Sequence, residues 1–209
     1  MADEPVLAET EDNVSRNENS SKHLSSFLLG GTCGASLMHL GYDSEPYAYG
    51  AVSFLLVKTL LKSLEGTLSD PPGYLVRFNG TVNKLSKFVP WALLNTEMFR
   101  RSGRLNNWNE AYFGFLMAAS VPTALAAVEL KESRFNSVVS MVNVLNLAGI
   151  SYLAVKQQNA WGIGLGAVCA LDCFLGAKLA GWSRLSESNM RNMLRCCFAG
   201  MIPFYLKSL

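Results

Sequence analysis

The chain has 209 residues, enough for one compact domain, and its formal net charge of +2 argues against extensive nucleic-acid binding. Its apolar fraction of 50% is only slightly above that of an ordinary soluble domain, so average composition does not separate membrane from cytosolic proteins. The distribution of charge is more informative. Residues 111–128 and 137–155 contain no charged side chain, and residues 160–177 contain only Asp172.

These uncharged stretches favour a membrane protein over a soluble helical bundle. A helix in a soluble bundle should carry a charged face opposite its apolar stripe, and these stretches have none. Helices that are apolar all round need lipid or the centre of a large protein, and this chain is too short to bury three of them. The sequence therefore predicts an all-α fold, a polytopic membrane helical bundle with about six transmembrane helices.

The first 23 residues differ from the rest. They contain six acidic residues, several Asn and Ser, and almost no large apolar side chains. Such a composition cannot bury enough surface to offset chain entropy, so residues 1–23 are expected to form a disordered acidic cytoplasmic tail. Residues 24–209 are expected to form the transmembrane helical domain.

Hydropathy and turn signals divide this domain into segments. The expected spans are residues 24–40, 46–64, 110–128, 137–155, 160–181 and 189–206. Residues 65–86 are expected to be a long polar connection, broken at Asp70-Pro71-Pro72-Gly73. Residues 85–99 are apolar but too short to span, which predicts an interfacial or re-entrant helix.

Six crossings place both termini on the same side of the membrane. That side carries eleven Lys and Arg residues near span ends, against five on the other side. Because basic residues near span ends are retained in the cytoplasm, both termini are predicted to be cytoplasmic.

Asp172 is the most informative single residue, because an acid in the middle of an apolar span costs roughly 3 kcal/mol to insert and must face the bundle interior. Its functional interpretation is an ion or proton relay, or a substrate contact. Its structural interpretation is an acid that fixes helix packing. Ser140, Asn143 and Asn146 follow a three-residue spacing, and we expect them to form a polar seam between residues 137–155 and 160–181.

Small residues four positions apart are expected to form helix contact faces, since they let two backbones approach closely in lipid. Pore lining and oligomerisation are alternative roles for such faces. The residues concerned are Gly30, Gly34, Gly114, Gly162 and Gly166.

Five cysteines lie in or beside apolar stretches and are expected to be small buried residues rather than a disulfide framework. A metal site built from Cys169, Cys173 and His39 is disfavoured, because metal sites show tighter ligand motifs and more histidine. No catalytic triad or phosphate-binding loop is recognisable. No catalytic residue, metal or cofactor is therefore expected.

The stretch Asn159-Ala160-Trp161-Gly162-Ile163-Gly164-Leu165-Gly166-Ala167, together with the expected hairpin over residues 24–64, resembles small uncharacterised multi-pass families named only as transmembrane proteins. The resemblance implies a multi-pass architecture and no particular activity.

Three hypotheses for function follow. The first is a structural or interaction protein that acts through helix contacts, with the lipid bilayer, a second copy or another membrane protein as partner. The second is a small transporter or channel that uses Asp172 and the Asn143/Asn146 seam. The third is an intramembrane lipid-modifying enzyme.

Overall fold

The computed structural model describes residues 24–68, 70–102, 132–183 and 186–208. Within these ranges the chain is all-α, as predicted, and no residue is in a strand. The first helix covers residues 24–39. It is followed by α2 (Pro46–Thr67), α3 (Gly73–Leu85), α4 (Val89–Arg101), α6 (Glu132–Lys156), α7 (Ala160–Ala170), the π-helical turn η1 (Leu171–Leu175), α8 (Gly176–Ser183) and α9 (Glu187–Lys207).

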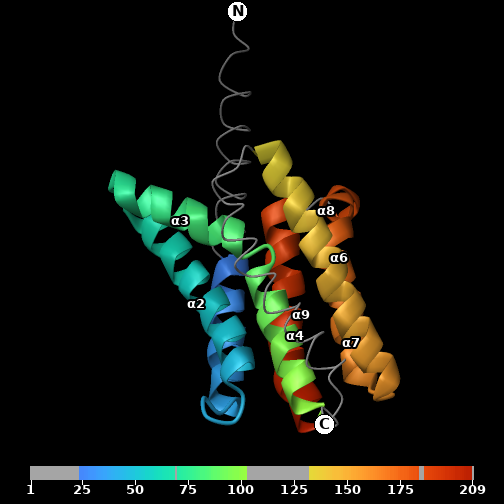
Figure 1. Ribbon diagram of the computed structural model, residues 1–209. Helices are drawn as coiled ribbons and strands as arrows, with labels where there is room; N and C mark the ends of the chain where they lie inside the picture. Colours follow the sequence, from blue (N-terminus) through green and yellow to red (C-terminus); the bar gives the residue numbers. More distant parts are fainter. Residues whose placement is uncertain (1–23, 69, 103–131, 184–185, 209) are drawn as a thin grey trace, which may run out of the picture.

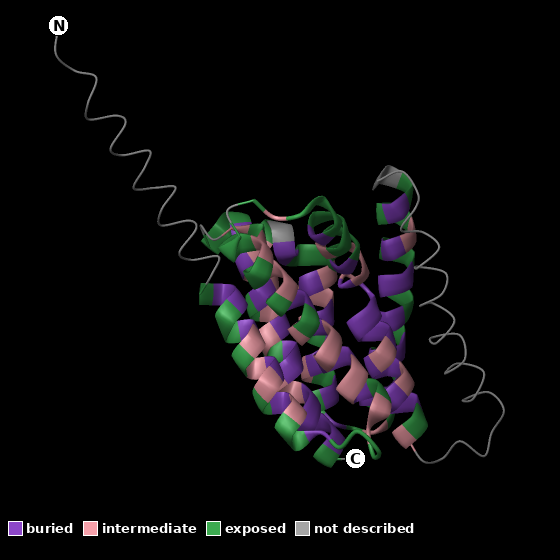
Figure 2. Cartoon of the chain, turned by 90° about the vertical axis from the view of Figure 1, so that its left-hand side faces the viewer, coloured by how far each residue is buried: buried purple, intermediate pink, exposed green. Residues whose placement is uncertain are grey.

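The long helices pack side by side, and α3 lies across one end of them (Figure 1). In the middle, α4 packs beside α9, where the rings of Trp91 and Phe198 lie 4.1 Å apart between centroids. On one side of this pair lie α2 and the helix of residues 24–39, and on the other lie α6, α7 and α8 (Figure 1). Figure 2 shows the buried residues gathered on the inward sides of the helices.

The helix of residues 24–39 runs in the same direction as α9. Ser25 donates a hydrogen bond to Asn189 at 2.8 Å, and Ser36 donates to the carbonyl of Ala199 at 2.8 Å. Residue 24 and the end of α9 therefore lie at opposite ends of the bundle. We call the end that carries α3 and the start of α9 the α3 end, and the other the C-terminal end.

The segment predicted as an interfacial or re-entrant helix, residues 85–99, is instead part of the core. It forms α4, whose buried residues include Trp91, Leu94 and Met98. α4 runs beside α9 through the middle of the bundle.

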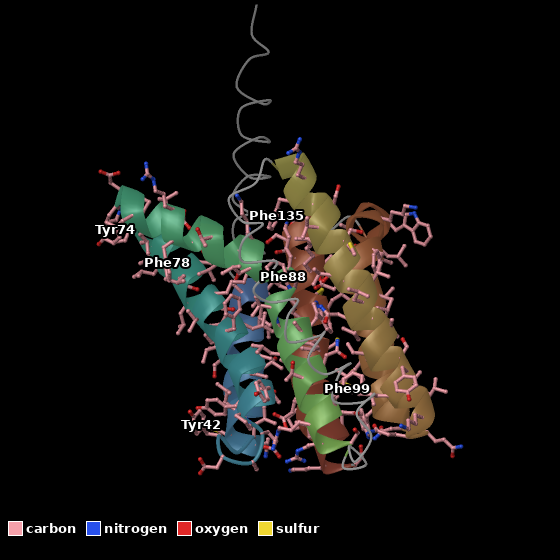
Figure 3. All side chains as sticks on the ribbon, viewed as in Figure 1. Tyr42, Tyr74, Phe78, Phe88, Phe99 and Phe135 are labelled. Atoms are coloured by element: carbon pink, nitrogen blue, oxygen red, sulfur yellow. The ribbon has the colours of Figure 1, made fainter. Side chains whose placement is uncertain are left out.

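The polar connection predicted over residues 65–86 contains α3, which was missed. Pro72 is the N-cap, and the helix has polar residues at several interior positions. Leu75 and Val82 face inward, whereas Tyr74 and Phe78 are exposed at 77% and 54% and are visible at the outer end of α3 (Figure 3). This is the pattern of an amphipathic helix that lies on a surface.

Among the described residues, one helix is long and apolar enough to cross a membrane by length and composition, namely residues Arg134–Lys156 of α6. The predicted bundle of six spans is therefore not supported. The expected span over residues 110–128 lies outside the described residues. The expected span over residues 160–181 is a shorter apolar helix, Ala160–Leu175, followed by α8.

The glycines predicted to form contact faces have different environments. A Cβ on Gly162 would lie 3.0 Å from Ala154 Cβ and from Tyr205 Cε2, so this glycine lets α7 approach both α6 and α9. A Cβ on Gly166 would be in ordinary contact with Ile150. A Cβ on Gly30 would lie 3.4 Å from Thr59, whereas one on Gly34 would meet no atom within 4 Å. Gly114 lies outside the described residues.

Candidate functional site

Asp172 lies on the π-helical turn between α7 and α8, where its side chain points into the bundle. A π turn accommodates one extra residue within a helix and is frequent at functional sites. Asp172 is 1% exposed, so its carboxylate is removed from solvent almost completely. A buried carboxylate is costly unless charged or hydrogen-bonding groups surround it.

Two arginines of α9 supply those charges. Arg195 Nε lies 3.4 Å from Asp172 Oδ2, and Arg195 is itself only 3% exposed. Arg191 Nη1 donates to the backbone carbonyl of Asp172 at 3.1 Å and lies 3.9 Å from its Oδ1. Asp172 Oδ1 has no hydrogen-bond partner. Arg191 also pairs with Glu187 at 2.8 Å. Asp172, predicted to be the only charged residue in its span, therefore forms an ion cluster with Glu187, Arg191 and Arg195 of α9.

A cavity of about 280 Å³ opens beside this cluster at the α3 end. Its cationic lining comes from three parts of the chain: Lys58 from α2, Lys87 from the α3–α4 connection, and Arg191 and Arg195 from α9. Asn83 of α3 and Asn192 of α9 add carboxamide groups. Lys58 is 7% exposed although it is a lysine, so its side chain lies inside the bundle.

Four basic side chains meet at this cavity. Two of them have acids of the chain beside them: Arg191 pairs with Glu187 at 2.8 Å, and Arg195 lies 3.4 Å from Asp172. An anion in the cavity would meet nitrogen donors from two arginines and two lysines, and guanidinium and amine groups are the donors that compact oxyanions prefer.

The polar seam predicted to face Asp172 has a different partner. Asn95 of α4 donates to Asn146 of α6, at 2.9 Å to the backbone carbonyl and 3.0 Å to Oδ1. Asn143 is buried, with no hydrogen-bond partner for its Oδ1, and Ser140 is exposed. The seam therefore joins α6 to α4, and the structure does not bring Asn143 or Asn146 into a hydrogen bond with Asp172.

The cysteines are buried less uniformly than expected. Cys33 and Cys169 are buried, Cys173 and Cys196 are partly exposed, and Cys197 is exposed. The Sγ atoms of Cys169 and Cys173 are 4.0 Å apart, and both thiols are free. Within the described ranges, no three His, Cys, Asp or Glu side chains are grouped as they would be around a metal ion.

Sequence reasoning found Asp172 but missed the basic residues around it. Arg191 and Arg195 were counted as charges near the start of the last helix, and Lys58 as a charge near the end of an earlier one. The available signal was the same as for Asp172: Lys58 and Arg195 each lie within a stretch of mostly apolar residues. Charged residues in such stretches face the interior and pair with one another.

The chain was compared with known families, curated proteins and solved structures. Residues 43–207 match the model of a family described as a domain of unknown function, DUF4791, so the chain belongs to this family. No curated protein matches the chain, and no solved structure matches it. The matched range includes all the residues of the cationic cavity.

Proposed function

We propose that this DUF4791 protein is an integral membrane protein that binds a small anion in the cavity between α2, α3 and α9. The observation that carries the proposal is the group of four basic side chains, Lys58, Lys87, Arg191 and Arg195, around one cavity of about 280 Å³. That volume is just below the roughly 300–1,000 Å³ usual for small-molecule sites. It suits a compact group such as phosphate better than a large organic ligand.

The outer faces of the helices support the membrane part of the proposal. The exposed side of α6 carries Met141, Val144, Tyr152 and Val155, so the outer face of this helix is largely apolar. A helix of that kind needs lipid on its outer face in a protein of this size.

α2 and α9 are also long enough to span, at 22 and 21 residues. Their charges lower their mean hydropathy, but Lys58, Arg191 and Arg195 line the cavity rather than the outer surface. The outer face of α2 carries Val57, Leu60 and Leu64, all of them exposed. Interior charges on otherwise apolar helices are what a membrane-embedded binding site requires.

The distribution of basic residues supports one orientation. The described basic residues outside the cavity are Lys62, Arg77, Lys84, Arg134 and Lys178 toward the α3 end, and Arg100, Arg101, Lys156 and Lys207 toward the C-terminal end. With the cavity residues added, the α3 end is the more basic. By the preference of basic residues for the cytoplasmic side, we place the α3 end in the cytoplasm and the end of α9 on the opposite side.

Phosphate titration of the detergent-purified full-length protein tests the proposal, with Lys87→Gln as the variant and Lys178→Gln as the matched control. Lys87 lines the cavity at a partly exposed position, whereas Lys178 is an exposed lysine on α8 outside it. We expect Lys87→Gln to weaken phosphate binding by about 1.5 kcal/mol, roughly tenfold, because one charge-assisted contact is lost.

The control variant should bind phosphate as the wild type does, and both variants should keep the wild-type melting temperature without phosphate. Equal weakening by the two substitutions, or no saturable phosphate binding by the wild type, would overturn the anion site. The protein for this experiment is taken from membranes washed with alkaline carbonate, and its release into the wash would contradict the membrane part.

A second candidate function is contact with another copy of the chain or another membrane protein. It is favoured by the helix of residues 24–39, where a Cβ on Gly31 or Gly34 would meet no atom within 4 Å. Phe27 and Met38 on the same helix are 77% and 88% exposed. Such a face suits a helix partner, and it is compatible with an anion site in another part of the bundle.

A further inference from the structure

We propose, as a consequence of the anion site above, that its ligand is the phosphate group of an anionic membrane lipid from the leaflet at the α3 end. The shared chemistry with free phosphate is a compact oxyanion held by ammonium and guanidinium donors. Three further observations favour the lipid as its source: the shape of the cationic hollow, its depth in the bundle, and the surface of α3 beside it.

The cationic cavity extends beyond the four basic residues that define it. A second hollow of about 310 Å³ adjoins it and shares Lys58, Asn83 and Ser188 in its lining. This outer hollow lies between α2 and α3 and adds Lys62 and Glu65, the latter hydrogen-bonded to Asn79. Together the two hollows form an elongated polar groove. A lipid head group is longer than an isolated phosphate and would use both parts.

In the membrane placement proposed above, the groove is expected to lie near the level of the lipid phosphates. It is at one end of the long helices, just past the exposed apolar residues Leu60 and Leu64 of α2. On α2, Lys58 and Lys62 are four residues apart and share the groove face, while Leu60 and Leu64 point to the outer surface. α2 therefore has an apolar face toward the outside and a basic face toward the groove.

α3 has the composition of a helix at the membrane interface. Tyr74 and Phe78 are exposed at its outer end (Figure 3), and Arg77 and Thr81 share that outward side. Tyr and other amphipathic or aromatic side chains accumulate at the level of lipid head groups. Another side of α3, with Asn79 and Asn83, faces the groove. A lipid beside α3 could therefore place its phosphate in the groove while its acyl chains stay in the bilayer.

The experiment uses the full-length protein in detergent and three probes: dihexanoylphosphatidic acid, dihexanoylphosphatidylcholine and inorganic phosphate. We expect phosphatidic acid to bind about tenfold tighter than inorganic phosphate, because it occupies both hollows. We expect phosphatidylcholine to bind about tenfold more weakly than phosphatidic acid, because its choline ammonium is repelled by the groove.

Lys62→Gln gives the discriminating variant, because Lys62 lines the outer hollow and not the inner one. It should weaken phosphatidic acid binding about fivefold to tenfold and leave phosphate binding within about twofold. Lys178→Gln again serves as the control, with no expected effect on either probe.

The possible results separate this inference from the proposed function. If inorganic phosphate binds as tightly as phosphatidic acid, or if Lys62→Gln affects neither probe, the lipid inference is wrong and the anion site stands. If none of the three probes binds saturably, both proposals are wrong. Binding of all lipids with equal affinity would show partition into apolar surface, which also overturns the lipid inference.

Discussion

Replacement of Asp172 by leucine is expected to lower the free energy of unfolding by about 3–5 kcal/mol, which should reduce the melting temperature by roughly 10 °C. The reason is the burial of its partners. Arg195 lies 3.4 Å from the Asp172 carboxylate and is 3% exposed, so its guanidinium cannot turn to solvent when the carboxylate is removed. The loss should be measured by thermal unfolding of the detergent-purified protein.

The double variant Asp172→Leu with Arg195→Leu is the matched control for this effect. Removal of both ions leaves no unpaired buried charge between them, so the double variant should be more stable than Asp172→Leu alone. An equal or greater loss in the double variant would mean that the Asp172–Arg195 ion pair does not explain the effect.

Asp172→Asn separates the two roles that the sequence allowed for this residue. Asp172 is a negative charge next to the proposed anion site, so its neutralisation removes a repulsion between this carboxylate and the bound anion. The affinity for phosphate should therefore stay the same or increase. If Asp172 contacts a transported cation or solute instead, Asp172→Asn should abolish that binding with little change in melting temperature. Loss of phosphate binding at an unchanged melting temperature would contradict the account.

Glu97→Leu is expected to have an effect of similar size, about 3–5 kcal/mol of lost stability, at the opposite end of the bundle. Glu97 is fully buried, and its Oε2 accepts hydrogen bonds from the backbone N–H groups of Tyr47 at 3.0 Å and Ala48 at 3.4 Å. These N–H groups belong to the first turn of α2 and have no partner within that helix. Arg100 pairs with the other oxygen of Glu97 at 2.6 Å.

Glu97→Gln keeps an acceptor for the α2 N–H groups and loses the charge, so we expect about half the effect of Glu97→Leu. Asp43→Asn, at an exposed acid of the same end, should leave the melting temperature unchanged. Phosphate affinity should stay at the wild-type value in all three variants that keep their fold, because the cavity lies at the α3 end. A wild-type melting temperature for Glu97→Leu would contradict the burial of α4.

The helices with continuous apolar patterns were predicted well from the sequence. The expected segments 46–64, 137–155 and 189–206 correspond to the helices α2, α6 and α9; α2 begins at the expected residue, and the other five ends extend by one to five residues. The residues added at these ends are largely polar, so a hydropathy pattern assigns them to loops. The helical hydrogen bonding of the backbone nevertheless continues through them. The all-α class followed from the same patterns.

The position of α4 could not be read from its own residues. Its apolar run is too short to span a membrane, which suggested an interfacial or re-entrant helix, and its polar residues Asn95 and Glu97 gave no indication of where it packs. In the structure the partners of these two residues come from distant segments: Asn95 pairs with Asn146, and Glu97 caps the start of α2. Long-range pairing of this kind turns a polar segment into a core helix, and a single sequence contains no local sign of it.

Only part of the candidate site could be predicted, because the partners of Asp172 also come from a distant segment. A carboxylate within an apolar stretch identified Asp172 as an interior residue, since insertion of an unpaired acid is costly. Its partners were sought on the preceding helix, where Asn143 and Asn146 have a suitable spacing. Arg191 and Arg195 were placed at the start of the expected span 189–206 and counted only as basic residues near a span end. Only the packing of α9 against η1 shows that they face Asp172.

The most direct test of the central claim is to locate an anion in the protein. Tungstate has the charge and shape of phosphate and scatters anomalously, so crystals of the full-length protein grown with tungstate would place it by X-ray diffraction. The account predicts an anomalous peak within contact distance of Lys58, Lys87, Arg191 and Arg195. A well-ordered structure whose cavity holds no tungstate while these four side chains pair with acids of the chain itself would contradict it.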